Sequence, residues 1–333
     1  MKRLRLAAAL VALACLLAPP PARPATAQAP LVLKVATSDA IDSPTHALMQ
    51  AFARHAAEVS GNQIEVKLFT GGALGAERDV LKRVRAGSIQ AAVVSLEALA
   101  AEVPAASVLL APHLFRNLKE SDRRLDGSIR KALQSLLAKH DMVFGAWGPS
   151  ELRGWASAGS SPLDAKSAAQ LVHAAPRSVA ETKIAEALGM ELSQTPLRTL
   201  ESLAGNTAYA ASLTPLELIA AGLERDATHY AVTNHSLQAA VLVYSKRWYE
   251  GLPEDPKRGL AKLPASITRD ARKAQRALRP RMLEALEARG VEVVEPSSRE
   301  RRALTRALRS VPAAVAAEGG GMSKRMLRAA RGG

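Results

Sequence analysis

The sequence predicts an α/β fold, in which parallel strands alternate with helices. Three short apolar runs, 31–37, 64–70 and 89–95, have the length and the β-branched content of buried strands. Two stretches in which apolar residues recur at helical spacing separate these runs. Because parallel strands joined by helices are covered on both faces, we expect a helix-covered sheet and not a barrel of hairpins.

Both expected helices carry end signals. The first begins at Ser43-Pro44, where a capping side chain precedes a proline at the first helical position, and it ends at a Gly-Asn pair. The second runs from Glu77 to Ala86 and stops before Gly87. This part of the chain is therefore predicted to form a βαβαβ unit.

The later chain repeats this alternation of strands and helices. Strands are expected at 141–147, 171–175, 190–194, 207–212, 228–233, 239–245 and 291–294. Helices are expected at 182–188, 199–204, 215–223 and 256–289, the last with a kink at Pro280, and a basic helix capped by Ser298 follows. Since no long low-complexity linker separates these elements, we expect two domains joined through strands, which is a hinge geometry.

The N-terminus has the layout of a secretory signal peptide. Basic residues at the start precede an apolar run from Leu6 to Ala18, and small residues then lead to cleavage after Ala27. Lipoprotein processing at Cys15 is the alternative, although its surroundings match a lipoprotein signal poorly. The apolar run is short for a membrane span. Because Cys15 is the only cysteine, disulfides and thiolate catalysis are excluded from the mature chain.

The charge of the chain raises the question of nucleic-acid binding. The net charge is +14, and much of the excess lies in the signal segment and in residues 299–331, where nine basic side chains oppose two acidic ones for a net +7. Aromatic residues, which stack on bases, make up only 3% of the chain. We therefore expect no nucleic-acid partner, and we interpret the basic end as a solvated helix face or as a surface attracted to anionic membranes.

Signals of catalysis, metal binding and cofactor binding are missing from the sequence. The seven histidines form no pair at the spacing that presents two metal ligands on one helix face. The glycines at 71, 72 and 75 lack the ending of a phosphate-binding loop, and no Gly-x-Ser-x-Gly motif occurs. We expect a protein that is not an enzyme and requires no cofactor.

Six segments, in order, resemble one known family. They are SPTHALMQAFARHAAEVSGNQIEVKLF (43–69), GALGAERDVLKRVRAGSIQAAVVS (72–95), APHLFRN (111–117), ELRGWAS (151–157), EALGMEL (186–192) and VTNHSLQAAVLVYSKRWYEGLP (232–253). Together they resemble the extracytoplasmic solute receptors of tripartite ATP-independent periplasmic (TRAP) transporters, of the dicarboxylate-receptor type.

This resemblance implies the periplasmic-binding-protein fold, with two α/β domains tied by hinge strands and a long connecting helix. It implies a periplasmic receptor that captures a small organic acid by hinge closure and delivers it to the membrane permease subunits of a TRAP transporter. The implied organisation is a signal peptide at 1–27, a first domain at 30–148 plus about 232–252, and a second domain at 149–231 plus about 253–333.

The resemblance also points to a binding arginine and to a missing one. Arg153 in ELRGW matches the first arginine of the family. The second, which typically clamps the carboxylate of the solute, falls on Ala174, and alanine cannot replace a guanidinium that makes two parallel hydrogen bonds. In a strand, His173 points to the opposite face from position 174. Arg177, and after it Arg78, are therefore the expected helpers of Arg153.

The remaining wall of the binding site is expected at the carboxyl ends of the strands, where open α/β sheets bind ligands. The expected residues are Thr37, Ser38, Ser95, Glu97 and Thr214, with Tyr209 as the one aromatic residue. Two interpretations of Arg153 stay open, a ligand-binding arginine and a salt-bridged one. Glu97 is equally typical of an ordinary carboxylate at the start of a helix.

Two further hypotheses about function remain. The absent second arginine is compatible with a divergent receptor for a more apolar or neutral solute. It is also compatible with an exported sensor or scaffold protein that has no role in transport. The sequence leaves the identity of the ligand and the oligomeric state open.

Overall fold

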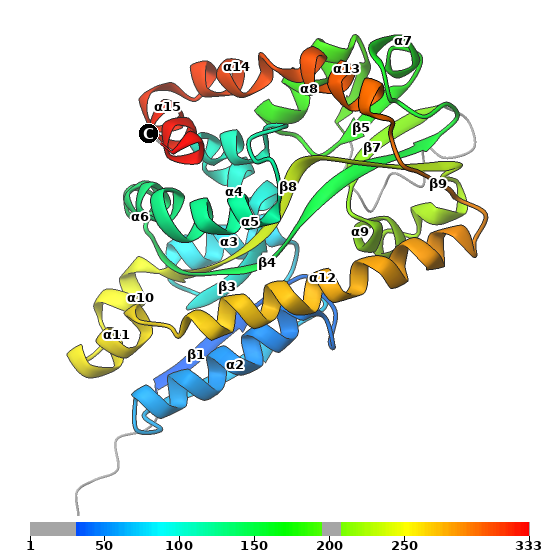
Figure 1. The fold of residues 1–333 in the computed structure, drawn as a ribbon. Coiled ribbons are helices and arrows are strands. Elements are labelled where there is room, and N and C mark those ends of the chain that lie inside the picture. Colours follow the sequence, from blue (N-terminus) through cyan, green and yellow to red (C-terminus); the bar gives the residue numbers. More distant parts are fainter. Residues whose placement is uncertain (1–30, 195–207, 333) are drawn as a thin grey trace, which may run out of the picture.

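The computed structural model describes residues 31–194 and 208–332, and a mixed nine-stranded sheet forms its framework (Figure 1). The strand order is β2-β1-β3-β8-β4-β7-β5-β6, and β9 pairs with β8. The strands are β1 (Leu31–Ala36), β2 (Ile64–Phe69), β3 (Ala91–Ser95), β4 (Met142–Ala158), β5 (Val172–Ala175), β6 (Glu191–Gln194), β7 (Tyr209–Leu213), β8 (His229–Ser245) and β9 (Glu292–Val294).

Two long antiparallel strands, β4 and β8, run through the whole sheet and connect its two ends (Figure 1). Each contains 17 residues, and nearly all of them are buried because helices cover both faces. The pairing shifts register between Trp147 and Ser150. The irregular pairing allows Gly148 and Pro149 to lie within the strand, because proline has no backbone N–H to donate to the regular hydrogen bonds between neighbouring strands.

The first lobe contains the parallel strands β1 to β3, their helices, and the helical segment that follows. The helices are α2 (Pro44–Val59), α3 (Glu77–Ala86), α4 (Leu96–Glu102), the 3₁₀ helix η1 (Pro104–Leu110), α5 (Leu118–Arg124), a π turn (Leu125–Ile129) and α6 (Arg130–Leu137). Ser43 caps α2, as expected, by accepting a hydrogen bond from the backbone N–H of His46. Gly87 ends α3 in the left-handed conformation that glycine favours.

The second lobe contains the parallel strands β5, β6 and β7 with their helices. The helices are α7 (Ala165–Ala168), α8 (Val179–Leu188), α9 (Pro215–Ala220) and the 3₁₀ turn η5 (Leu223–Arg225). Thr214 and Glu217 form a reciprocal capping box at the start of α9, which therefore begins directly at the carboxyl end of β7. The expected helix at 199–204 lies outside the described residues.

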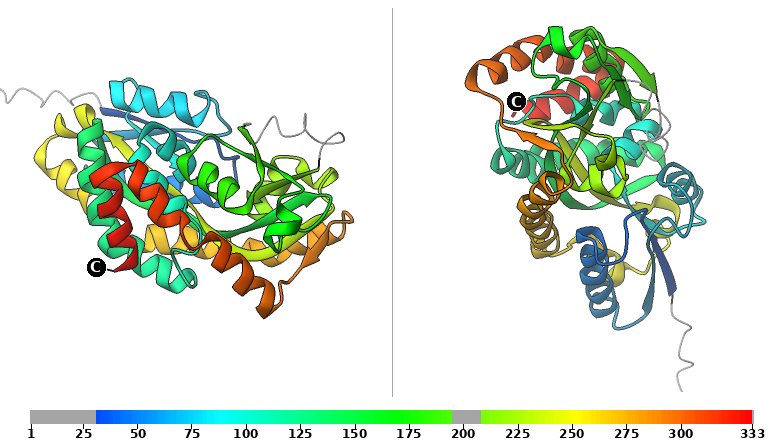
Figure 2. Two further views of the ribbon diagram at one scale, coloured as in Figure 1. Left: turned by 90° about the horizontal axis from the view of Figure 1, so that it is seen from above. Right: turned by 90° about the vertical axis from the view of Figure 1, so that its right-hand side faces the viewer.

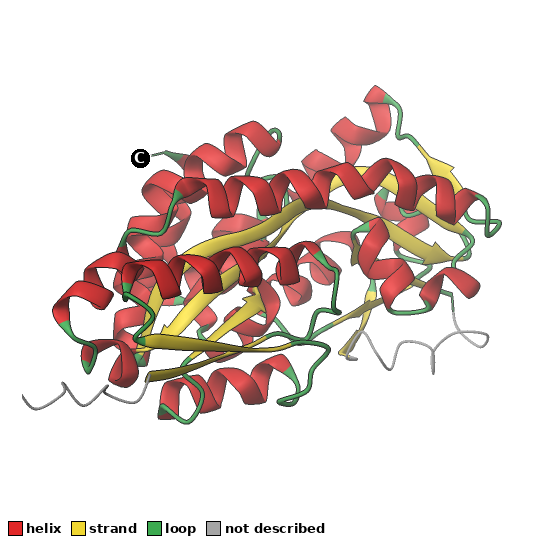
Figure 3. Cartoon of the chain, turned by 90° about the horizontal axis from the view of Figure 1, so that it is seen from below, coloured by secondary structure: helices red, strands yellow, loops and turns green. Residues whose placement is uncertain are grey.

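Helices from the C-terminal part of the chain cover both faces of the sheet. They are α10 (Lys246–Glu250), α11 (Glu254–Ala261), α12 (Ala265–Glu287), α13 (Ser298–Leu308), α14 (Val311–Glu318) and α15 (Gly320–Arg331). The long helix α12 lies beside α2 on one face and also contacts α9 of the second lobe (Figure 3). On the other face, α13 and α14 pack against α8, whereas α15 packs against η1 and α6 (Figure 2).

The core follows this two-faced arrangement. Side chains on one face of the central strands join the cluster under α4, α6, α8 and the C-terminal helices. Side chains on the other face join the clusters under α2 and α12 and under α9. Ala92 and Val94 belong to the first group and Ala91 and Val93 to the second, as the alternation of a strand requires.

Four sequence-based expectations about elements were wrong. The separate strands at 228–233 and 239–245 are one strand, and the strand at 141–147 continues to Ala158, because burial on both faces removes the polar alternation that marks strand ends. The helix expected at 256–289 is divided into α11 and α12. Ser297, not Ser298, caps α13. The proposed domain boundaries remain a prediction, although α15, which the sequence assigned to the second lobe, packs against η1 and α6 of the first lobe.

Candidate functional site

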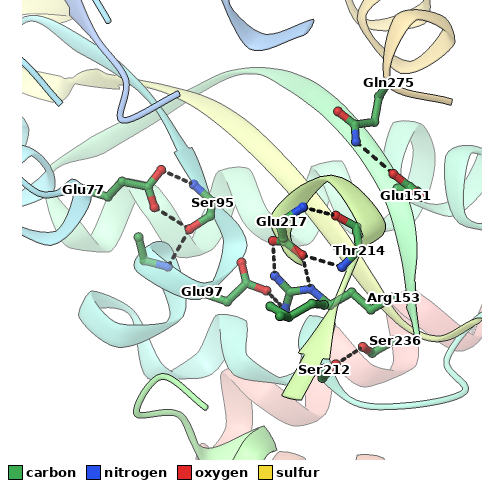
Figure 4. Close-up of polar contacts among 12 residues, drawn as sticks. Glu77, Ser95, Glu97, Glu151, Arg153, Ser212, Thr214, Glu217, Ser236 and Gln275 are labelled. Atoms are coloured by element: carbon green, nitrogen blue, oxygen red, sulfur yellow. Dashed lines mark hydrogen bonds and ion pairs between the residues drawn. The ribbon is translucent and has the colours of Figure 1, made fainter. Parts of the chain in front are cut away.

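The side chain of Arg153 lies buried on β4, at the junction of the two lobes, with 4% of its surface exposed (Figure 4). Its Nε donates a hydrogen bond to Glu217 Oε2 over 3.0 Å, and its Nη2 donates to Glu217 Oε1 over 2.5 Å. Its Nη1 forms an ion pair with Glu97 Oε1. One guanidinium therefore connects a carboxylate of the first lobe with a carboxylate of the second.

The capping box of α9 positions Glu217. The Thr214 hydroxyl accepts a hydrogen bond from the backbone N–H of Glu217 over 3.1 Å. In return, Glu217 Oε2 accepts one from the backbone N–H of Thr214 over 2.8 Å. The same carboxylate oxygen that binds Arg153 Nε is thus held by the start of the helix. This double use of the carboxylate fixes its orientation toward Arg153.

Glu97 lies in the first turn of α4, where the Ser95 hydroxyl caps the helix by accepting from the backbone N–H of Ala98. Both carboxylate oxygens are buried, and among the described residues Oε2 accepts no hydrogen bond. Burial raises the pKa of Glu97 to about 7, which the attraction of Arg153 opposes and the charge of Glu217 reinforces. The positive charge of Arg153 therefore offsets only part of the effect of burial on the Glu97 carboxylate.

A second carboxylate, Glu77 at the start of α3, lies next to Ser95. Its Oε1 accepts the Ser95 backbone N–H over 3.1 Å, and its Oε2 accepts the Ser95 hydroxyl over 2.6 Å (Figure 4). Ser38, which follows β1, also hydrogen-bonds this carboxylate. Burial raises the pKa of Glu77 despite these hydrogen bonds. Thr37 is buried at the end of β1, where its hydroxyl accepts the backbone N–H of Asp39 over 3.3 Å.

The charges at the lobe junction are unbalanced toward negative. Burial works against the charged form of Arg153, but the charges of Glu217 and Glu97 outweigh burial and raise the pKa of Arg153. The acid groups act on one another as well, since Asp39 lies within electrostatic reach of both Glu77 and Glu217. Arg153 is accordingly one cation among several carboxylates.

The structure brings together six of the residues expected at the site and leaves three away from it. Ser95, Glu97 and Thr214 lie at the lobe junction beside Arg153 of β4 (Figure 4). Thr37 and Ser38 follow the carboxyl end of β1, where Ser38 hydrogen-bonds Glu77. Arg177 is exposed and makes no hydrogen bond or ion pair with a described residue. Tyr209 is buried at the opposite end of β7 from Thr214, and burial raises its pKa to about 12. Arg78, the other expected helper, is exposed and pairs with Glu102 over 2.7 Å.

Position 174 is part of the apolar core. Ala174 is 1% exposed and packs in the cluster under α9 with Tyr209 and Leu213. His173 points to the other face, as expected, where its Nε2 lies 2.7 Å from Glu181 Oε2 and its ring meets Trp155 edge-on. The apolar surroundings of Ala174 explain the substitution locally, because an arginine there would need a partner for its charge.

Sequence reasoning missed Glu217, Glu77 and the buried aromatic group behind Arg153. The Thr-Pro-x-Glu pattern at 214–217 is a readable helix-start signal, but its pairing with a residue 64 positions away is not. Behind the arginine, Trp155 stacks on His235 with a centroid distance of 4.7 Å. Burial lowers the pKa of His235 well below its ordinary value, so this ring packs as a neutral group.

No group of three or more His, Cys, Asp or Glu side chains suited to a metal ion occurs within residues 31–194 and 208–332. Two cavities lie elsewhere in the described chain. One, of about 770 Å³, lies between α12 and the segment from α5 to α6, and one of about 410 Å³ lies beside α13. Arg153 lines neither of these two cavities, nor a third between α2 and α12. Its guanidinium is contacted by the carboxylates of Glu217 and Glu97.

Residues 35–318 match the bacterial extracellular solute-binding protein family 7, DctP. The chain belongs to this family. A solute-binding protein of Chromohalobacter salexigens is 27% identical over 104 residues, which is 31% of either chain, so the match spans about a third of that relative. None of the helices in the described part of this DctP-family chain has the length and hydropathy needed to cross a membrane.

Two solved structures show the same two-domain fold as this family 7 protein. A TRAP periplasmic solute-binding protein of Sulfitobacter sp. NAS-14.1, with bound β-D-galacturonate, aligns with a TM-score of 0.82 over 90% of this chain and 100% of its own, at 20% identity. One of Pseudomonas aeruginosa PAO1, with bound L-malate, aligns with a TM-score of 0.77 over 85% of this chain and 99% of its own, at 21% identity. The expected α/β fold with two domains is confirmed.

Proposed function

We propose that this protein is the periplasmic receptor of a TRAP transporter, which captures a small organic acid between its lobes and delivers it to the membrane permease subunits. Membership of the solute-binding family supports the receptor role. The carboxylates named with the two similar structures support an acid as solute. The observation that carries the proposal is the buried guanidinium of Arg153 between the two lobes.

Capture follows from hinge closure about β4 and β8, the strands common to both lobes. Glu97 from the first lobe and Glu217 from the second reach the same arginine on β4, so the distance between the lobes and the charges at their junction are coupled. A solute that contacts both lobes stabilises the closed form by its higher affinity for that form. The closed form is then the one that docks on the permease.

The proposal assigns no covalent step and no cofactor to the protein. Arg153 offers a planar fork that makes two parallel hydrogen bonds to a carboxylate, and no second cleft arginine stands at position 174. The signal peptide predicted from the sequence, with cleavage after Ala27, supports export to the periplasm. Recognition of the acid requires its carboxylate to share or displace the contacts that Glu217 and Glu97 make with Arg153.

Thermal melts of the mature chain, which begins at Gln28, test the proposal. The panel contains uronic, aldonic, hydroxy, amino and aromatic acids, with sugars and neutral apolar compounds as comparison. Because a ligand that binds only the folded state raises the melting temperature, we expect an acid to stabilise the protein. Arg153→Lys keeps the charge but loses the fork, and it should weaken binding at least tenfold.

The matched control is Arg177→Lys, which makes the same change at an exposed arginine and should leave the affinity unchanged. Stabilisation by neutral apolar compounds together with silence across all acids would contradict the proposal. Equal losses in both arginine variants would also contradict it, because the effect would then not depend on the fork of Arg153.

A further inference from the structure

The fork of Arg153 is already occupied in the protein itself. Glu217 makes the two parallel hydrogen bonds from Nε and Nη2 that the carboxylate of a solute would make, over 3.0 and 2.5 Å. Glu97 takes the remaining side of the guanidinium through Nη1. Above pH 7, where Glu97 with its pKa of about 7 is mostly ionised, the two carboxylates and the one guanidinium carry a net charge close to −1 before any solute arrives.

Arg153 is the one cation among the groups that act most strongly on Glu97. The charged groups that act on Glu97 are Arg153, Glu217 and Glu181, of which only the arginine is positive. Asp39 and Glu77 add further negative charge nearby. Position 174, where the resemblance places a second arginine, carries a core alanine. A simple acid that entered this site would bring its charge to −2, in surroundings where buried like charges repel strongly.

One acceptor at the site is also unused. Glu97 Oε2 is buried and accepts no hydrogen bond from the described residues, which is costly unless a donor arrives. An ammonium group carries three N–H donors and a positive charge. Such a group beside Glu97 would satisfy Oε2 and would return the site to its original charge of −1 even after a carboxylate has bound.

From this geometry we propose that the solute is a zwitterion, an acid that carries an ammonium group, and that Glu97 and Glu217 determine this specificity. The ammonium group binds between the two glutamates and donates to Glu97 Oε2. The carboxylate of the solute shares the donors of Arg153 with Glu217. This inference rests on the proposed function, since it names the class of acid that the receptor takes.

Matched acids that differ only in one group test the inference. The pairs are L-malate with L-aspartate, L-lactate with L-alanine, and D-gluconate with D-glucosaminate, in each of which an ammonium group replaces a hydroxyl. Binding is measured by calorimetry at pH 7.5. In at least one pair we expect the amino acid to bind ten times more tightly than the hydroxy acid, because only the amino acid supplies the missing positive charge.

Glutamine variants locate the source of this preference. Glu97→Gln and Glu217→Gln keep the shape of the side chain and remove its charge, so the preference should fall at least fivefold in each. Glu186→Gln, at an exposed glutamate of α8 that pairs with Lys183, should keep the wild-type preference. Since the readout is a ratio of two affinities in one protein, a general loss of stability in a variant does not imitate the expected result.

Two results overturn the inference. In the first, the hydroxy acids bind as tightly as their amino partners, which shows that the glutamates do not select an ammonium group but leaves the proposed function standing. In the second, none of the three amino acids binds, which also shows that the glutamates do not select an ammonium group. Binding of glucosamine, which has no carboxylate, as tightly as glucosaminate would instead overturn the proposed capture of an acid and the inference with it.

Discussion

Glu97 links the chemistry of the site to the stability of the protein. Its pKa is about 7 in the folded chain and near the ordinary 4.5 in the unfolded chain, because burial disfavours its charged form. Between these two values folding takes up a proton. The contribution of this group to stability is therefore fully present below pH 4.5, falls as the pH rises toward 7, and stays constant above it.

Glu97→Gln should remove this part of the pH dependence. We expect the melting temperature of the wild type to fall between pH 5 and pH 7.5 by several degrees more than that of the variant, and melts in matched buffers at both pH values measure the difference. Glu186→Gln, at an exposed glutamate, serves as the control and should keep the wild-type pH profile. Identical pH profiles in the wild type and in Glu97→Gln would show that Glu97 is ionised throughout this range.

The sequence led to Arg153 but not to what surrounds it. The resemblance identified the arginine from a short motif. Ser95, Glu97 and Thr214 were predicted beside it because they lie at or just after the carboxyl ends of the strands now labelled β3 and β7. Glu217 looked like an ordinary first-turn carboxylate, because a local helix signal carries no information about a partner on a distant strand. Long-range pairing of this kind depends on strand order, which a single sequence does not contain.

At the scale of elements, two capping boxes of the same type allow a matched experiment. Thr214 and Glu217 start α9 at the lobe junction, whereas Ser297 and Glu300 start α13, away from Arg153. Replacement of either capping residue by alanine should cost about 1 kcal/mol, which lowers the melting temperature by a few degrees. Because Glu217 binds Arg153, only Thr214→Ala disturbs the site as well.

We therefore expect Thr214→Ala to change the dissociation constant of the acid found in the screen at least threefold, and Ser297→Ala to leave it unchanged. Melting curves and calorimetry on both variants provide the two readouts. An equal effect of the two variants on affinity would mean that the orientation of Glu217 does not matter for binding.

Local signals predicted elements well where caps mark their ends. Ser43-Pro44 and Gly87 placed the ends of α2 and α3 correctly, since a side-chain cap and a left-handed glycine are local features. The strand in β4 was ended too early at its Gly-Pro pair, and β8 was divided at its polar positions 234–236, because such positions imitate turns. Those positions are tolerated at register shifts inside a sheet that is covered on both faces, a condition that only the assembled fold supplies.

At the scale of the whole molecule, the lobes are joined by more than the two crossing strands. On one face α12 contacts α2 and α9, and on the other the run from α13 to α15 passes from α8 to η1 and α6. Hinge closure must therefore bend or slide these helical connections along with the strands. The sequence had indicated a basic tail for this last segment, since the exposed charges of an amphipathic helix dominate its composition.

Removal of residues 320–333 tests whether α15 is a structural element or a surface appendage. Met326, Leu327 and Ala330 are buried against the first lobe, and the Ser128 hydroxyl donates a hydrogen bond to the carbonyl of Ala329 over 2.6 Å. Burial of two large apolar side chains and an alanine contributes on the order of 5 kcal/mol, a large share of the stability of an ordinary domain. The truncated chain should melt at least 10 °C lower than the full chain or fail to fold.

The control for this truncation neutralises the exposed charges of the same helix. Lys324→Gln, Arg325→Gln and Arg328→Gln, combined in one variant, leave the buried face intact and should keep the wild-type melting temperature, because these side chains are exposed. A harmless truncation would show that α15 is a surface appendage, and a charge variant as destabilised as the truncated chain would show that the basic face is the structural part of α15. If the truncation destabilises the protein and the charge variant does not, the apolar face of α15 packs on the first lobe, and its basic face is free to contact the permease or an anionic membrane surface.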